Sequence, residues 1–224
     1  MVRIGNLELN RSIVASIAKD PVDSATRAKK LGADILELRI DLLEEDAGRI
    51  LKDVRKTGLP IIITNRAKQE GGAWKGTEDD RIRTLLSLMP VADAIDIELS
   101  AKMRDAVVKK AKSTGKTVII STHDFQKTPD FDNMIGTIKE SFDAGADIAK
   151  LAVMPGSLDD VLRLLDVTLH AGGAVCTIAM GETGRHSRVI APVYGSVMTY
   201  GYVETATAPG QLRVDELKTI LNLL

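Results

Sequence analysis

The stretch ILELRID at residues 35–41 alternates apolar with charged side chains. Successive side chains of a strand point to opposite faces, so one face is apolar and the other carries Glu37, Arg39 and Asp41. The stretch AIDIEL at 94–99 alternates in the same way. Strands of a parallel sheet are usually covered on both faces and read as near-continuous apolar runs. These two strands therefore carry charges where burial would normally exclude them.

Six further β-rich runs place these two strands in a repeat. Segments of helical periodicity separate most of the runs, and the turns carry Gly, Pro or helix-capping residues. The predicted strands are SIVASI at 12–17, ILELRI at 35–40, PIIITNR at 60–66, AIDIEL at 94–99, TVIISTH at 117–123, IAKLAVM at 148–154, AVCTIAM at 174–180 and VMTYGYV at 197–203. The repeat predicts an α/β fold, a (β/α)8 TIM barrel forming one domain over 1–224, with an open doubly wound sheet as the alternative.

Helix-start and helix-stop residues mark the connecting segments. DSATRAKKLGA at 23–33 begins with Asp23 as the expected N-cap, and VDELKTILNLL at 214–224 closes the chain. The region at 181–196 is rich in Gly and is broken by Pro192, so it is the weakest helix prediction.

Composition limits the partners and the compartment. Thirty Lys and Arg against 31 Asp and Glu leave a net charge of −1, which predicts no nucleic-acid or membrane partner. The single Cys176 lies in an apolar run and is expected to be an inert core thiol. The start MVRIGNLELNRS lacks signal-peptide features, so we expect a cytoplasmic protein. Three scattered histidines and one cysteine show no metal-ligand spacing, so neither a metal nor a cofactor is expected.

In a barrel, the apolar sides of the strands face the helices and the charged sides face the interior. Glu37, Asp96 and Glu98 then need basic partners or hydrogen-bond donors. A half-exposed antiparallel sheet with a solvated polar face is the alternative, which the regular helical spacers disfavour.

Polar residues also gather at the C-terminal ends of the predicted strands, where barrels place catalytic groups. They are Arg39, Arg66, Glu70, His123, Lys150 and Arg188. Arginines and carboxylates around a histidine and a lysine predict a small anionic, hydroxylated substrate and acid-base chemistry on it.

Lys150 lies in the middle of the apolar run GADIAKLAVM at 145–154. It is either an edge-strand lysine, a core lysine paired with a carboxylate such as Glu98, or a reactive amine. Burial favours the neutral form of an amine, which attacks a carbonyl to form a Schiff base. Ala152 lies on the same strand face and leaves room beside it.

Local motifs along most of the chain match one family. They are ELR at 37–39, TNRAKQEGG at 64–72, DIEL at 96–99, STHDF at 121–125, AKLA at 149–152, SR at 187–188 and APGQ at 208–211. In order and spacing, the chain resembles the type I 3-dehydroquinate dehydratases. The resemblance implies a metal-free (β/α)8 barrel, a homodimer, and dehydration of 3-dehydroquinate to 3-dehydroshikimate in the shikimate pathway.

The resemblance also implies residue roles. Lys150 would form the Schiff base, His123 would be the general acid/base, and Glu70 would support His123. The substrate-binding residues would be Glu37, Arg39, Arg66, Met180, Arg188, Thr207 and Gln211, with Arg188 holding the substrate carboxylate.

The chain departs from the family pattern at a few positions. Thr207 stands where relatives commonly carry Ser, and Ile178 stands where a second wall methionine is common. The short N-terminus leaves little beyond VRIGNLELN at 2–10 to form the hairpin that closes the barrel bottom in longer relatives.

Two other functions remain open from the sequence. A class I aldolase also carries a Schiff-base lysine in a barrel, and the glycines after the late strands could cradle its phosphate. A non-catalytic metabolite-binding barrel would use Lys150 only as an ion-pair partner of Glu98.

Overall fold

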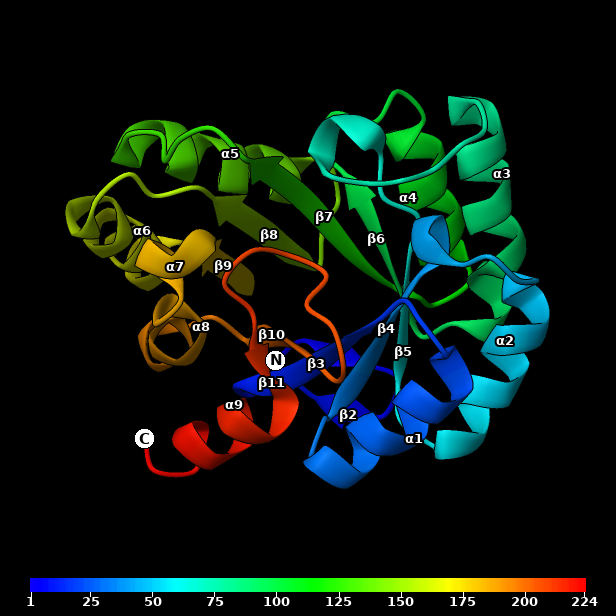
Figure 1. The fold of residues 1–224 in the computed structure, drawn as a ribbon. Coiled ribbons are helices and arrows are strands. Elements are labelled where there is room, and N and C mark those ends of the chain that lie inside the picture. Colours follow the sequence, from blue (N-terminus) through cyan, green and yellow to red (C-terminus); the bar gives the residue numbers. More distant parts are fainter.

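All eight predicted strands are present in the computed structural model, which describes residues 1–224 (Figure 1). The strands are β3 (Ser12–Ile17), β4 (Ile35–Arg39), β5 (Ile61–Thr64), β6 (Ala94–Glu98), β7 (Thr117–Asp124), β8 (Ile148–Val153), β9 (Val175–Ala179) and β10 (Met198–Tyr202). The largest error is at the end of β5, which was expected at Arg66 and lies at Thr64.

The strands are parallel and pair in chain order from β3 to β9, with β10 on the other side of β3. The two-residue strand β11 (Leu212–Arg213) pairs with β10. A parallel bridge between Val175 and Ser196 joins β9 to the start of β10, and the Val197 N–H donates to the Val175 carbonyl at 2.8 Å. The sheet therefore curls into the predicted barrel, and the open doubly wound alternative is wrong.

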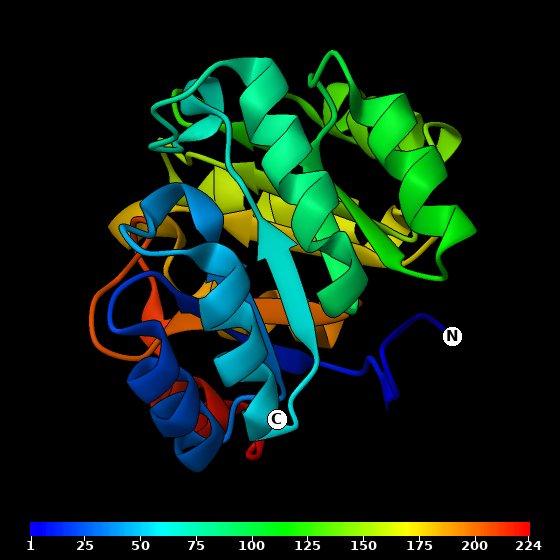
Figure 2. The same ribbon diagram turned by 90° about the vertical axis from the view of Figure 1, so that its right-hand side faces the viewer.

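Helices surround this sheet on its outer side (Figure 2). The helices are α1 (Pro21–Leu31), α2 (Ala47–Val54), α3 (Glu78–Leu88), α4 (Arg104–Ser113), α5 (Phe131–Asp143), α6 (Leu158–His170), α7 (Gly181–Gly184), α8 (Ser187–Ile190) and α9 (Val214–Leu221). None of them is long and apolar enough to cross a membrane.

The expected N-cap at Asp23 is wrong. The N-cap is Asp20, three residues earlier, and helix α1 begins at Pro21, because proline suits a first helical position that needs no N–H donor. Asp23 lies in the first turn, where its charge favours the helix N-terminus. The region at 181–196 forms only the short helices α7 and α8 and a 3₁₀ turn at Ala191–Tyr194.

Alternating strand residues divide the buried side chains between the interior of the barrel and its outer layer. Outward residues such as Leu36, Ile63 and Ile97 pack against the helices. Inward residues in the N-terminal half of the strands, such as Ile35 and Ile119, form a separate apolar cluster. Two residues further along, the inward positions become polar: Glu37 after Ile35, Thr64 after Ile62, Asp96 after Ala94, Ser121 after Ile119 and Lys150 after Ile148.

A short hairpin covers the N-terminal end of the barrel. Strands β1 (Arg3–Ile4) and β2 (Leu7–Glu8) pair antiparallel around a turn with a positive φ of 55° at Gly5. Ile4 and Leu9 join the apolar cluster of the barrel interior. The few residues of the N-terminus therefore form this hairpin, because two apolar side chains are enough to continue the interior cluster.

We predict that Ile4→Ala lowers the free energy of unfolding by about 2–5 kcal/mol, since Ile4 is fully buried and the change leaves a cavity. Urea unfolding followed by circular dichroism measures this difference. The control Leu158→Ala, at a residue that is 63% exposed, should change it by no more than about 0.5 kcal/mol. Equal effects of the two changes would contradict the role given to the hairpin.

Candidate active site

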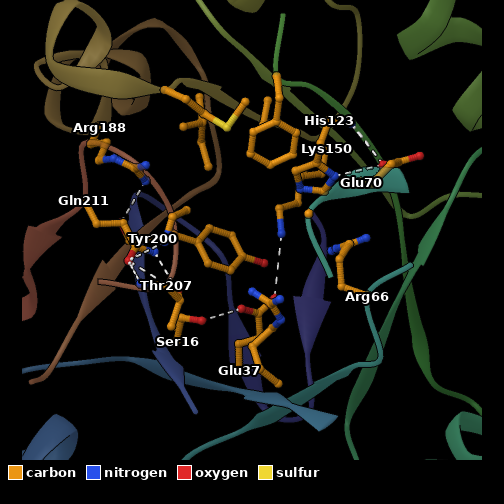
Figure 3. Close-up of a pocket in the computed structure, with 17 residues that line it drawn as sticks. Ser16, Glu37, Arg66, Glu70, His123, Lys150, Arg188, Tyr200, Thr207 and Gln211 are labelled. Atoms are coloured by element: carbon orange, nitrogen blue, oxygen red, sulfur yellow. Dashed lines mark hydrogen bonds and ion pairs between the residues drawn. The ribbon is translucent and has the colours of Figure 1, made fainter. Parts of the chain in front are cut away.

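A pocket lined by 17 residues opens at the C-terminal ends of the strands (Figure 3). The structure brings all ten residues predicted for the site to this pocket: Glu37, Arg39, Arg66, Glu70, His123, Lys150, Met180, Arg188, Thr207 and Gln211.

Lys150 is almost completely buried, with a side chain that is 6% exposed. Its Nζ lies 2.9 Å from Asp96 Oδ2 and 3.7 Å from Glu37 Oε1. The same Nζ lies 4.0 Å from the centroid of the Tyr200 ring, which is within cation–π distance. Two carboxylates and one aromatic face therefore position the amine at the wall of the pocket.

Glu98, a possible partner of Lys150 from the sequence, binds two arginines instead. Its Oε1 lies 2.9 Å from Arg66 Nη1, and its Oε2 lies 2.9 Å from Arg81 Nη1. Both carboxylate oxygens are thus occupied by guanidinium groups. Lys150 is therefore a buried lysine paired with a carboxylate, but that carboxylate is Asp96 and not Glu98.

Arg66 connects the charged groups of the interior. Its Nη2 lies 2.8 Å from Asp96 Oδ1, and its Nη1 also donates to Ser121 Oγ at 2.7 Å. Burial alone would lower the pKa of Arg66, but the carboxylates of Asp96 and Glu98 outweigh burial and raise it. For Asp96, burial alone would raise the pKa, but the charges of Arg66 and Lys150 outweigh burial and hold the pKa well below its usual range. Arg66 and Asp96 therefore stay charged although they are buried.

His123, near the end of β7, pairs with Glu70 in the 3₁₀ turn Lys68–Glu70. Glu70 Oε2 lies 3.0 Å from both Nδ1 and the backbone N of His123, and Ser100 Oγ donates to Oε1 at 2.8 Å. Because a carboxylate only accepts, Nδ1 carries the hydrogen and Nε2 keeps a free lone pair. Burial, and then the charges of Arg66 and Lys150, lower the pKa of His123 well below its ordinary value. The imidazole is therefore neutral and can act as a base.

The two glycines after Glu70 shape the loop that presents it. A Cβ at Gly72 would lie 1.9 Å from the Arg66 carbonyl oxygen, so no larger residue fits there. Gly71 has a φ of +82°, and a Cβ there would meet the Phe125 ring at 2.6 Å. The EGG segment of the motif is thus required by the close packing of this loop under the pocket.

Arg39 lines the pocket as part of an ion pair. Its Nε and Nη2 donate to the two oxygens of Asp41 at 3.0 and 2.8 Å. Asp41 also accepts the backbone N–H groups of Arg66 and Ala73. Burial would raise the pKa of Asp41, but the bond and charge of Arg39 outweigh it and lower the pKa. Asp41 therefore ties the loop after β5 to β4 and orients the Arg39 guanidinium.

Arg188 differs from the other arginines of the pocket because it has no carboxylate partner. It is 1% exposed and donates to the carbonyl oxygens of Tyr200, Pro209 and Gly210 at 3.2, 2.9 and 2.8 Å. Burial lowers the pKa of Arg188 to about 10. An arginine that lines a pocket without a counter-ion is suited to bind an anion there.

The loop between β10 and β11 is folded around Gln211. Gln211 Oε1 accepts from the backbone N–H of Thr207 at 2.7 Å and from that of Ala208 at 3.3 Å. Thr207 Oγ1 also lies 3.2 Å from Gln211 Nε2. This bonding holds the loop in a compact shape beside the pocket.

Apolar side chains form another part of the pocket wall. They are Ala152 on β8, Ile178 on β9 and Met180 directly after β9. Ala152 and Lys150 both line the pocket, so they lie on the same side of β8 as predicted. Cys176 is fully buried below them, and burial raises its pKa to about 12, which agrees with an inert thiol.

Sequence reasoning missed three contributors. Ser16 donates to Glu37 Oε2 at 2.8 Å, and Tyr200 lies under Lys150. Both lie on predicted strands at inward positions, so strand alternation could have found them. Arg81 lies on α3, where sequence pattern alone does not separate a buried arginine from the exposed Arg83.

Comparison with known proteins identifies the family. The family model described as Type I 3-dehydroquinase matches residues 12–224. The 3-dehydroquinate dehydratases of Methanosarcina barkeri and Methanosarcina acetivorans are 54% and 51% identical, with 100% of each chain covered. The crystal structure of type I 3-dehydroquinate dehydratase from Clostridium difficile with covalently modified comenic acid has a TM-score of 0.91 at 31% identity. It covers 99% of this chain and 96% of its own. The chain therefore belongs to the type I 3-dehydroquinase family.

Proposed function

We propose that this protein dehydrates 3-dehydroquinate to 3-dehydroshikimate in the shikimate pathway, through a Schiff base on Lys150 with His123 as general acid/base. The observation that carries the proposal is a buried lysine that shares one small pocket with a neutral histidine and an arginine without a counter-ion. Family membership supports the same reaction. The full chain, residues 1–224, would form one catalytic domain.

Substrate binding uses polar and apolar side chains that line the pocket. Arg188 binds the substrate carboxylate, since it has only carbonyl partners within the protein. Arg39, Arg66 and Glu37 bind hydroxyl groups of the ring at the opposite side of the pocket. Thr207 and Gln211 add polar contacts from the loop after β10, and Met180 packs against the apolar face of the ring.

The covalent step uses the amine of Lys150. The lone pair of the neutral amine attacks the C3 ketone, and a proton moves from nitrogen to oxygen to form a carbinolamine. His123 then passes the proton that it took from the Lys150 ammonium group to the carbinolamine hydroxyl, which leaves as water and gives a cationic imine. This step needs the neutral amine, and the carbonyl substrate is held beside it by the pocket. Glu37 and Asp96 then stabilise the positive charge of the imine, since both lie within 4 Å of Nζ.

Elimination uses His123. Its free Nε2 removes a proton from C2, and the electron pair moves into the imine to form an enamine. The pair then returns to expel the C1 hydroxyl, which takes the proton from the imidazolium and leaves as water. Hydrolysis of the imine releases 3-dehydroshikimate and restores Lys150. Glu70 keeps the hydrogen on Nδ1, so Nε2 remains the basic atom throughout.

We also propose that the protein is a cytoplasmic homodimer, as the family resemblance implies. Light scattering of the purified protein at micromolar concentration tests the dimer, because a mass near 24.2 kDa would instead indicate a monomer. Cell fractionation tests the location.

Borohydride reduction in the presence of 3-dehydroquinate tests the Schiff base. We predict a stable mass increase confined to the peptide that contains Lys150, and none in Lys150→Met, whose side chain has no amine. His123→Ala should still form some adduct but lose about 10²- to 10⁴-fold in turnover, because only proton transfer is removed.

If the protein without any substitution forms no adduct, that result would contradict both this mechanism and that of a class I aldolase. A non-catalytic binding barrel would then remain as the function. The appearance of conjugated enone absorbance separates dehydration from aldol cleavage.

The lowered pKa of His123 predicts the acid side of the pH profile. An ordinary imidazole gains a proton near pH 6.5, whereas this one stays neutral below that pH because burial and two neighbouring cations oppose the charge. The value of kcat/KM should therefore not fall until the pH is well below 6.5. Steady-state rates between pH 5 and 8 measure this, and a loss of half the activity at pH 6.5 would refute the neutral base.

A further inference from the structure

Tyr200 has a buried hydroxyl group that no atom of the protein hydrogen-bonds. The residue lies on β10, is 3% exposed and lines the pocket. Its hydroxyl oxygen is buried and without a partner. Figure 3 shows the ring reaching across the pocket wall, with the hydroxyl on the side of Lys150 and Glu37.

An unpaired buried hydroxyl is costly, and buried tyrosines usually find a partner. The neighbouring hydroxyls of the interior all have one. Ser16 donates to Glu37, Thr64 donates to the other oxygen of Glu37, and Ser121 donates to Asp96. Thr122, Thr128 and Thr199 also have buried hydroxyls without a partner, but none of them lines the pocket. Among the hydroxyls that line the pocket, those of Ser16 and Thr207 are hydrogen-bonded and that of Tyr200 is not, which indicates that its partner comes from a bound molecule.

The position of the Tyr200 ring indicates which part of the bound molecule would contact the hydroxyl. Lys150 Nζ lies 4.0 Å from the ring centroid, so a carbon bonded to Nζ lies next to the same ring. The hydroxyl at the edge of the ring then lies close to the substituents of that carbon. Burial, followed by the charges of Glu37 and Asp96, raises the pKa of Tyr200 well above its ordinary value, so the phenol keeps its hydrogen and can donate it.

We propose that the Tyr200 hydroxyl donates a hydrogen bond to the oxygen of the substrate carbonyl that Lys150 attacks. This inference rests on the proposed Schiff-base function. As the Nζ lone pair forms the C–N bond, the π pair of the carbonyl moves onto its oxygen, and a donor fixed beside that oxygen stabilises the growing negative charge. The phenol keeps its proton in this step, so Tyr200 adds to the proton transfers of His123 and does not replace them.

Tyr200→Phe tests the proposal because it removes only the hydroxyl and preserves the ring under Lys150. The rate of imine formation is measured by mixing protein and 3-dehydroquinate, quenching with borohydride at increasing times, and following the modified protein by mass spectrometry. We expect this rate to fall about threefold to tenfold, as for the loss of one hydrogen bond. The melting temperature should stay the same or rise, since no hydrogen bond within the protein is lost.

Tyr202→Phe is the matched control. Tyr202 lies two residues further along the same strand, is partly exposed and does not line the pocket, so its loss should leave the rate of imine formation unchanged. An unchanged rate in Tyr200→Phe would overturn the proposal, and a lower melting temperature would assign the hydroxyl a structural role instead. If the protein without any substitution forms no adduct, the proposed function itself fails and this inference fails with it. If the protein without any substitution is active and Tyr200→Phe forms the imine at the same rate, only the role of Tyr200 is rejected.

Discussion

The carboxylate of Asp96 binds two cations inside the barrel, with Oδ1 2.8 Å from Arg66 and Oδ2 2.9 Å from Lys150. The rest of the site depends on this interaction. An unpaired ion in the interior would be very costly, so the charged residues of β4, β6 and β8 are compatible with a barrel only as a balanced network. Formally, three carboxylates, Glu37, Asp96 and Glu98, face three basic side chains, Arg66, Arg81 and Lys150.

The same network sets the properties of the groups that the proposed chemistry uses. Lys150 is held by Asp96 and Glu37 at one wall of the pocket, with the Tyr200 ring beside it. The positive charges of Arg66 and Lys150 add to burial in keeping His123 neutral. Arg188 lies outside the network and keeps its charge free for an anion from solution. The site therefore combines a restrained amine, a neutral base and an unpaired cation.

Much of this arrangement could be predicted from the sequence, because alternation along a strand reports which side chains share a face. It placed Lys150 and Glu37 inward and located all eight strands. The ion pairs could not be predicted in this way. Glu98 and Asp96 share one strand face, but Arg66 and Arg81 occupy both oxygens of Glu98, and Lys150 pairs with Asp96. The roles of Arg188, Thr207 and Gln211 came from the family resemblance, since nothing in an arginine or glutamine of a loop reports where it will lie.

A double-mutant cycle on Asp96 and Lys150 tests the central interaction most directly. Urea unfolding would be measured for Asp96→Asn, Lys150→Met and the double variant. We predict that Asp96→Asn lowers the free energy of unfolding by about 3–5 kcal/mol, because it leaves buried cations without their carboxylate. The double variant should be at least about 1 kcal/mol more stable than the sum of the single effects implies. Effects that add to within about 0.5 kcal/mol would show that the two side chains are not coupled, and would contradict the account.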